Sequence, residues 1–283
     1  MLAAKHPVPF SLTKNVDIPS IPPVLIRIIQ SLEADTGSAK ELEDLILHDP
    51  ALSARILRLA NSAFYSFHST VKTISHAISL LGINLVTSLA IGTNIFDSFT
   101  KGASSEAKLI KGLWTHSCAV AVLVRESWRR FGRKEGEFAF LCGLLHDLGK
   151  VVLFKAYPGE YGSVFSTAKT ENDRTISSYE EEYYGADHAT IGEMLAKQWG
   201  FPTELSAIIR RHHDPLAAAM PMVNAVMVSD LVAKELKIGY DGDDGLGETE
   251  LTSKLKQSGT EYERLKEFAS CEQEKIEAFF QIS

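Results

Sequence analysis

Apolar residues recur three or four positions apart through most of this chain, and this spacing constrains its fold more than any other feature. The spacing places apolar side chains on one face of an α-helix. It is clear in residues 52–60, whereas residues 222–236 form an almost continuously apolar stretch. The β-prone stretch 151–154 is too short to anchor a sheet and follows directly from a helical pattern. The sequence therefore predicts an all-α fold.

Capping residues mark the beginning or the end of several predicted helices. Ser38 is followed three residues later by Glu41, which is the spacing of a capping box. Asp49 precedes Pro50, which suits the first position of a helix, and Gly82 closes another helix. The predicted helices span residues 24–32, the stretch that follows Ser38, and residues 50–60, 73–81, 83–99, 108–131, 138–154, 177–183, 188–199, 202–211, 222–236 and 250–280, the last as one helix or two.

Changes in composition along the chain predict its domain organisation. Five prolines stand before residue 24 and indicate an extended or turn-like segment. A short polar stretch at residues 100–105 separates two helical parts. We predict an N-terminal arm at 1–17, an N-terminal helical subdomain at 18–104, a second helical domain at 105–240 and a C-terminal helical extension at 241–283.

The composition excludes several classes of protein. The chain has 283 residues, of which 45% are hydrophobic, enough for a sizeable core. Its net charge of -7 argues against nucleic acid as a partner. Apolar runs such as residues 139–145 are far shorter than a membrane span, so we expect no membrane contact. The N-terminus lacks the apolar segment of a signal peptide and the three cysteines are widely spaced, so we expect a cytoplasmic protein with reduced thiols.

Histidines gather in the second half of the chain. A single histidine on a helix is usually a satisfied core or surface residue, so the argument depends on the group. Asp147 directly follows one of these histidines, and two others are adjacent, all on predicted helices with strong apolar faces. Five of the nine histidines form this group: His116, His146, His188, His212 and His213.

A carboxylate in an apolar helix strengthens the argument for a metal site. Asp230 lies between Val228 and Leu231 in the predicted helix 222–236. An unpaired carboxylate is costly to bury, so buried carboxylates and imidazoles need a shared partner. A divalent metal satisfies all of them, and this ligand mixture suits Fe, Mn, Ni or Zn better than Mg or Ca.

Two basic residues lie beside these groups in the sequence. Lys150 follows His146 by four residues and Asp147 by three, so it shares their helix face and suits a phosphate oxygen. The alternative is a surface lysine near a helix C-terminus. Arg211 directly precedes the histidine pair, where it either holds a phosphate or belongs to a solvated helix end.

These residues resemble a known superfamily. The segment 144–150, with His146 and Asp147, resembles the motif of the HD superfamily of metal-dependent phosphohydrolases, and His116 and Asp230 fit its first histidine and last aspartate. Residues 49–62 and 74–82 resemble the segments that define the HDOD subfamily. The resemblance runs from about residue 18 to 236 and implies an HD-like helical bundle with an N-terminal helical subdomain.

The resemblance also implies ligands for one or two metal ions. His116, His146, Asp147 and Asp230 resemble the ligands of the first metal in HD proteins. A second set is similar to the second metal site of the HD-GYP relatives and shares Asp147 with the first as a bridge. It consists of Asp147, His188, His212 and His213. Those relatives hydrolyse cyclic di-GMP.

Two functions follow from the resemblance. The first is a bacterial signalling protein that acts through a protein partner or a bound nucleotide or phosphate ligand. The alternative is an active di-metal phosphohydrolase on a cyclic dinucleotide or a nucleotide phosphate, in which Asp147 bridges two ions and Lys150 stabilises a phosphate oxygen. The Gly-Tyr-Pro motif of HD-GYP proteins is absent after His213, and Gly112 offers no carboxylate for a third metal. A plugged site favours the first function, and room for a phosphate favours the second.

Overall fold

Helices form the regular secondary structure of the residues that the computed structural model describes, and no strand occurs among them. The described residues are 25–29, 38–62, 64–65, 67, 69–100, 106–130, 136–171, 174–242 and 260–279. The prediction of an all-α fold is confirmed. The predicted arm at 1–17 and the polar residues 101–105 lie outside the described residues.

Most of the helices lie close to their predicted positions. Residues 25–29 are helical. The other helices are α2 Ala39–Leu47, α3 Pro50–Ala60, α4 Ile74–Leu81, α5 Ile83–Thr100, α6 Ala107–Arg130, α7 Gly136–Leu145, α8 Leu148–Ala156, α9 Glu160–Glu171, α10 Ile176–Tyr184, α11 His188–Gln198, α12 Thr203–Arg211, the 3-10 helix η1 Pro215–Ala219, α13 Pro221–Glu235 and α15 Thr260–Phe279.

The predicted caps are present. The Ser38 hydroxyl accepts the backbone N–H of Glu41 at 3.1 Å and begins α2. Asp49 caps α3 in front of Pro50, and Gly82 ends α4 with a φ of 86°. Ser38 and Asp49 accept backbone N–H groups that would otherwise have no partner at the start of a helix, and Gly82 adopts the positive φ at which α4 ends. These are local properties, which is why the sequence located these helix ends.

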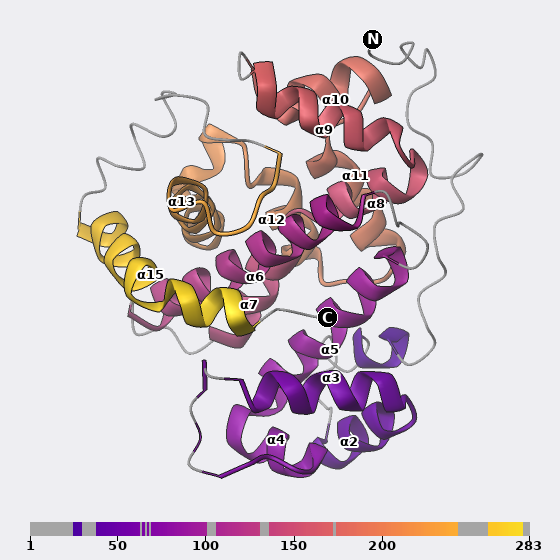
Figure 1. The fold of residues 1–283 in the computed structure, drawn as a ribbon, viewed down its shortest axis with the longest axis vertical. Helices are drawn as coiled ribbons and strands as arrows, with labels where there is room; N and C mark the ends of the chain where they lie inside the picture. The colour runs from indigo at the N-terminus through magenta and orange to yellow at the C-terminus, as the bar shows by residue number, and fades with distance from the viewer. Residues whose placement is uncertain are drawn as a thin grey trace.

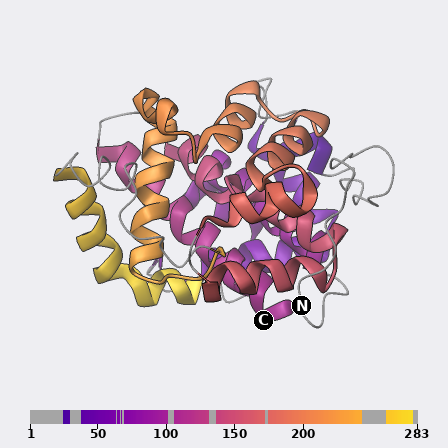
Figure 2. The ribbon, with the colours of Figure 1, turned by 90° about the horizontal axis from the view of Figure 1, so that it is seen from above.

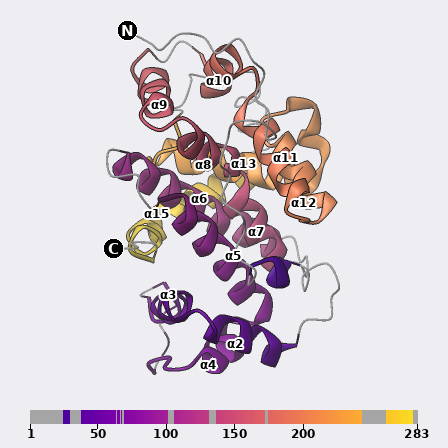
Figure 3. The ribbon, with the colours of Figure 1, turned by 90° about the vertical axis from the view of Figure 1, so that its right-hand side faces the viewer.

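An N-terminal group of helices lies at one end of the molecule. Helices α2, α3 and α4 pack on one another and on α5, whereas α9 and α10 lie at the opposite end (Figures 1 and 3). Helix α5 joins the two parts, because every residue from 85 to 96 is buried and the helix also packs on α7 and α8. The domain boundaries at 104/105 and 240/241 stay predictions.

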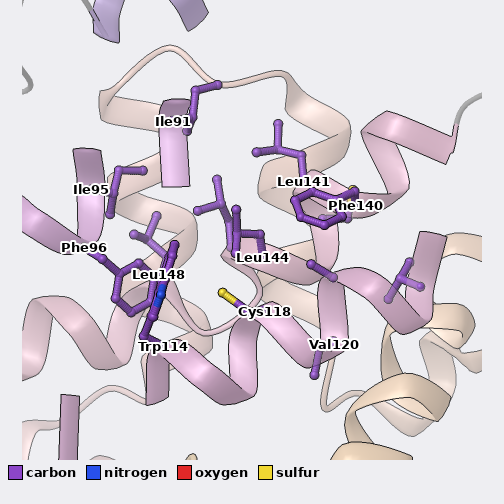
Figure 4. Packing of buried hydrophobic residues seen from close by; sticks show 14 of the residues in the cluster. Ile91, Ile95, Phe96, Trp114, Cys118, Val120, Phe140, Leu141, Leu144 and Leu148 are labelled. Atoms are coloured by element: carbon purple, nitrogen blue, oxygen red, sulfur yellow. The ribbon is translucent and has the colours of Figure 1, made fainter. Parts of the chain in front are cut away.

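The central core forms where α6, α7 and α5 meet. The ring of Trp114 lies 4.2 Å from that of Phe96, between their centroids, and Leu144 packs beside them (Figure 4). Cys118 and Cys142 are buried in this region. Helix α15 lies along α13 and α6, outside this core (Figure 2).

By length and composition alone, helix α6 could cross a membrane. The sequence analysis did not predict this, because the apolar residues of α6 are interrupted by polar ones. Of its most apolar window of 18 residues, 67% is buried inside the fold. A core helix passes the same test of length and composition, and burial by α7, α13 and α15 accounts for the apolar surface of α6.

The prediction of one helix at residues 138–154 is wrong, because the chain turns at His146 and Asp147 and divides it into α7 and α8. Both helices pack on α5, but α7 also packs on α6 whereas α8 packs on α11. A Cβ at Gly149 would lie 1.9 Å from the backbone oxygen of His188, so α8 can approach α11 this closely only with glycine. Long-range packing therefore ends α7 at a point that local periodicity does not indicate.

Two helical segments have no counterpart among the predictions. Helix α9 contains small and polar residues such as Gly162, Ser163 and Ser166, which weaken its apolar pattern. The 3-10 helix η1 is too short for a periodicity to appear. Helix α15 begins at Thr260, and residues 250–259 of the predicted C-terminal helix lie outside the described residues.

Candidate metal centre

The fold brings together all seven residues that the sequence analysis selected as metal ligands. They come from five places in the chain: α6, the turn between α7 and α8, the start of α11, the end of α12 and the middle of α13. Every one is buried except His213, which is partly buried. The seven residues, called the cluster below, are His116, His146, Asp147, His188, His212, His213 and Asp230.

One half of the cluster lies around the start of α11. The Nε2 atom of His188 lies 3.3 Å from Nε2 of His212 and 3.1 Å from Nε2 of His213. Asp147 Oδ1 lies 3.3 Å from His188 Nε2 and 3.5 Å from His212 Nε2. One ligand atom from each of these four residues therefore lies within 4.8 Å of the others.

The other half of the cluster lies between α6 and α13. Nε2 of His116 lies 2.9 Å from Oδ1 of Asp230. Nε2 of His146 lies 3.4 Å from Oδ2 of Asp147 and 3.9 Å from Oδ1 of Asp230. Asp147 thus presents Oδ2 to this half and Oδ1 to the other half, which is the arrangement that a bridging carboxylate requires.

Hydrogen bonds fix the tautomers of three histidines. A carbonyl oxygen can only accept, so Nδ1 of His146 donates to the Gly143 carbonyl and Nδ1 of His212 to the Ile209 carbonyl, each at 2.7 Å. Nδ1 of His188 lies 2.6 Å from the carboxylate of Glu180. In the neutral form each ring therefore directs an Nε2 lone pair into the cluster, as a metal ligand does.

Two buried atoms support the presence of a cation. His146 Nε2 and Asp147 Oδ1 have no hydrogen-bond partner among the described residues. A buried polar atom without a partner costs about 1–3 kcal/mol. If no proton lay between them, the Nε2 lone pairs that converge at 3.1–3.3 Å would also repel one another. A divalent ion would satisfy all these atoms, so the donor set fits a transition metal.

The electrostatics keep three of the ligands in the forms that bind metal. Burial lowers the pKa of His146 to about 4 and lowers that of His213 well below its usual value, so both rings stay neutral. Burial alone would raise the pKa of Asp147, but interaction with the neighbouring His146 ring and with the ammonium of Lys150 outweighs it and holds that pKa well below the usual range. Asp147 is therefore ionised near neutral pH.

Lys150 lies inside the cluster and not on the surface. Its side chain has 0% exposure, and its Nζ donates to Asp147 Oδ2 at 2.9 Å. The helix-end alternative is therefore wrong for this lysine. Arg211, in contrast, is exposed, and its Nε lies 3.6 Å from Oδ2 of Asp214. The structure does not bring the Arg211 guanidinium into the cluster.

Glu180 is a buried neighbour of the cluster that the sequence analysis missed. Its carboxylate accepts the backbone N–H of His188 at 2.7 Å, the ring N–H of His188 at 2.6 Å and the hydroxyl of Tyr161 at 2.5 Å. Burial lowers the pKa of His188, but Glu180 and Asp147 outweigh it and raise that pKa to about 9. Glu180 shares a helix face with Ile176, so the apolar spacing did contain a signal for its burial.

Two further missed residues lie at the other side of the cluster. Lys234 donates to Asp230 Oδ2 at 2.8 Å, and the spacing of four residues between them was a signal for this contact. Asp241 is buried and lies within 3.1 Å of the ammonium groups of both Lys150 and Lys234. The aspartates and glycines of residues 241–245 are typical of a flexible turn, so no local pattern gave a signal for the burial of Asp241.

The chain is similar to proteins of a known family in both sequence and structure. A sequence model of the HDOD domain matches residues 18–215. The crystal structure of an HDOD domain protein with unknown function from Geobacter sulfurreducens is 26% identical and superposes with a TM-score of 0.78, over 94% of this chain and 95% of that one.

Two other proteins are similar to this chain, one in structure and one in sequence. A candidate phosphohydrolase from Shewanella amazonensis SB2B is 24% identical, with a TM-score of 0.73 over 94% of this chain and 96% of that one. An uncharacterized protein of Treponema pallidum (strain Nichols) is 27% identical over 230 residues, which are 78% of this chain and 43% of the relative. The chain therefore spans less than half the length of that relative.

Proposed function

The chain belongs to the HDOD domain family, and from this premise we propose that it is a bacterial, cytoplasmic regulatory module built around a buried metal centre. The burial of the cluster is the observation that carries the proposal. The most exposed of the six buried ligands is Asp230, at 6%. A catalytic metal keeps a position open for water and substrate, whereas a structural metal is closed in by protein. The cluster resembles the closed kind.

The residues present define what a metal would do here. His116, His146, Asp147 and Asp230 would hold one ion, and Asp147 would share a second with the ligands His188, His212 and His213. A divalent ion would neutralise the ionised carboxylates and link the five chain segments that supply ligands. The proposed centre would thereby stabilise the helical domain that presents a surface to a signalling partner.

A cavity that no cluster residue lines supports a further part of the proposal, namely that the module binds a nucleotide or phosphate ligand. It has a volume of about 330 Å³ and lies between α6, α15 and the residues that follow α3. Its lining combines apolar, basic and acidic residues, among them Phe64, Phe268, Arg125, Arg129, Glu126 and Glu272. The buried Nε of Arg125 has no hydrogen-bond partner among the described residues. An anionic group of a nucleotide or phosphate ligand would accept from it.

The second candidate function is a metal-dependent phosphohydrolase. The position of Lys150, buried beside Asp147, favours it, because an ammonium at a metal centre can stabilise a phosphate oxygen. In that case the proposed centre would lower the pKa of a bound water, and Asp147 would hold both ions.

Elemental analysis of the anaerobically purified protein tests the proposal. We expect bound Fe, Mn, Ni or Zn in the wild type and its loss in Asp147→Asn, whereas the surface variant Asp214→Asn keeps the metal. We also expect the metal-loaded wild type not to hydrolyse bis(p-nitrophenyl) phosphate. Protein without metal after Fe, Mn or Zn is supplied would overturn the metal centre. Turnover that depends on Asp147 would replace the regulatory proposal by the hydrolase.

A further inference from the structure

The chain that follows α13 returns to the cluster as a short strap, defined here as residues 237–242. Lys237 and Gly239 have φ values of 55° and 74°, so the backbone reverses direction soon after α13 ends. The backbone N–H of Tyr240 then donates to the carbonyl of Gly112 in α6 at 2.9 Å. The strap therefore lies directly on α6, one turn from His116.

The strap is held in place by the two residues that precede Asp241. A Cβ at Gly239 would lie 2.2 Å from the backbone nitrogen of His116, so only glycine allows this approach. The ring of Tyr240 packs on that of Phe165, with 5.0 Å between the centroids, and its hydroxyl donates to the Phe165 carbonyl at 3.3 Å. These contacts fix where the carboxylate of Asp241 lies.

The carboxylate of Asp241 connects two ammonium groups. Its Oδ2 accepts from Lys150 Nζ at 3.1 Å and lies 3.1 Å from Lys234 Nζ. Each lysine also holds an aspartate of the cluster, Lys150 through Asp147 and Lys234 through Asp230. Asp241 is 1% exposed and Lys150 is 0% exposed, so neither charge has bulk water as an alternative partner.

One oxygen of Asp241 therefore occupies the point where the two ammoniums converge beside the cluster. A phosphate oxygen at a metal centre requires this environment, namely two cationic donors next to the ligands of a divalent ion. A phosphate could reach that point only after the carboxylate leaves, because two anions cannot share one buried pair of ammoniums without a large electrostatic cost.

We infer that Lys150 and Lys234 form an oxyanion site for a phosphate group and that Asp241 fills this site as an internal anion. The inference rests on the proposed metal centre for the second contact of the phosphate, whereas the two lysines act with or without metal. Residues 216–242, which include Lys234 and the strap, lie beyond the segment 18–215 that matches the HDOD domain model.

Binding of inorganic phosphate to the full chain tests the inference. We would measure it by isothermal titration calorimetry with the wild type, Asp241→Ala and Asp241→Asn, each with Mn²⁺ and after treatment with a chelator. Removal of the internal anion takes one of the anionic partners from each ammonium, so both variants should bind phosphate about tenfold more tightly than the wild type, or better. Asp241→Asn keeps the volume of the side chain, so it reports on charge if Asp241→Ala does not fold.

Two control variants make the result specific. Tyr240→Phe changes the same strap without changing its charge and should bind phosphate as the wild type does. Lys234→Met in the Asp241→Asn background should abolish the gain. Equal phosphate affinity in the wild type and Asp241→Asn would overturn the inference. Failure of the proposed metal centre would appear separately, as absence of bound Mn²⁺ while the gain persists in the chelator-treated protein.

Discussion

Replacement of Glu180 by glutamine probes how the protein prepares one metal ligand. The Glu180 carboxylate accepts three hydrogen bonds, two of them from His188. Glutamine keeps the length of the side chain but loses the charge and turns an NH₂ group toward groups that donate. The substitution therefore weakens the contact that fixes the tautomer of His188 and directs its Nε2 toward Asp147.

The magnitude follows from these contacts. A hydrogen bond to a charged group contributes about 1.5–3 kcal/mol, and a buried donor left without an acceptor costs about 1–3 kcal/mol. We expect the free energy of unfolding to fall by about 2–4 kcal/mol. Loss of a residue that orients a metal ligand lowers metal affinity by about 10–100-fold, which is about 1.4–2.7 kcal/mol of binding free energy.

The assay is a competition titration of Zn²⁺ between the protein and a chelator of known affinity, together with urea unfolding of the metal-free protein. Glu181→Gln is the matched control, because Glu181 is the next residue of α10 and is exposed. We expect Glu181→Gln to match the wild type in both measurements.

Two results would refute the reasoning. Glu180→Gln could bind Zn²⁺ as tightly as the wild type while Asp147→Asn loses it, which would show that His188 needs no orienting carboxylate. Alternatively, Glu180→Gln and Glu181→Gln could weaken binding equally, which would show that only the overall charge of α10 matters.

Three further substitutions test other parts of the structure. Gly149→Ala should destabilise the protein by about 1–3 kcal/mol or more in urea unfolding and release metal, because its Cβ would meet the His188 carbonyl; unchanged metal content would contradict the packing argument. Partial burial raises the pKa of Glu261, which accepts a hydrogen bond from Ser127. The contribution of neutral Glu261 to the stability of the fold is therefore fully present below pH 4.5 and declines as pH rises through the raised pKa. Thermal melts of Glu261→Gln should not show this decline, and a decline equal to that of the wild type would exclude Glu261 as its cause. Asp49→Ala should cost about 1 kcal/mol through loss of the α3 cap and leave metal content unchanged by elemental analysis, whereas loss of metal would show that the cap of α3 supports the centre.

Much of the fold was predictable because its signals are local. The caps at Ser38 and Asp49 and the apolar spacing of α3 depend on neighbours a few residues away. The break between α7 and α8 was not predictable, because it depends on how closely Gly149 approaches α11, which is about forty residues farther along the chain.

The residues of the candidate site also fall into two groups, those that the sequence identified and those that only the structure revealed. By itself, the sequence determined the all-α fold and identified the seven cluster residues, because their types and their apolar surroundings are local properties. Only the tertiary structure decided that these residues meet in a buried site and that Glu180, Lys234 and Asp241 complete it. Asp241 is 91 residues from Lys150, and no periodicity extends over that separation. Such a contact exists only after the chain has folded back on itself.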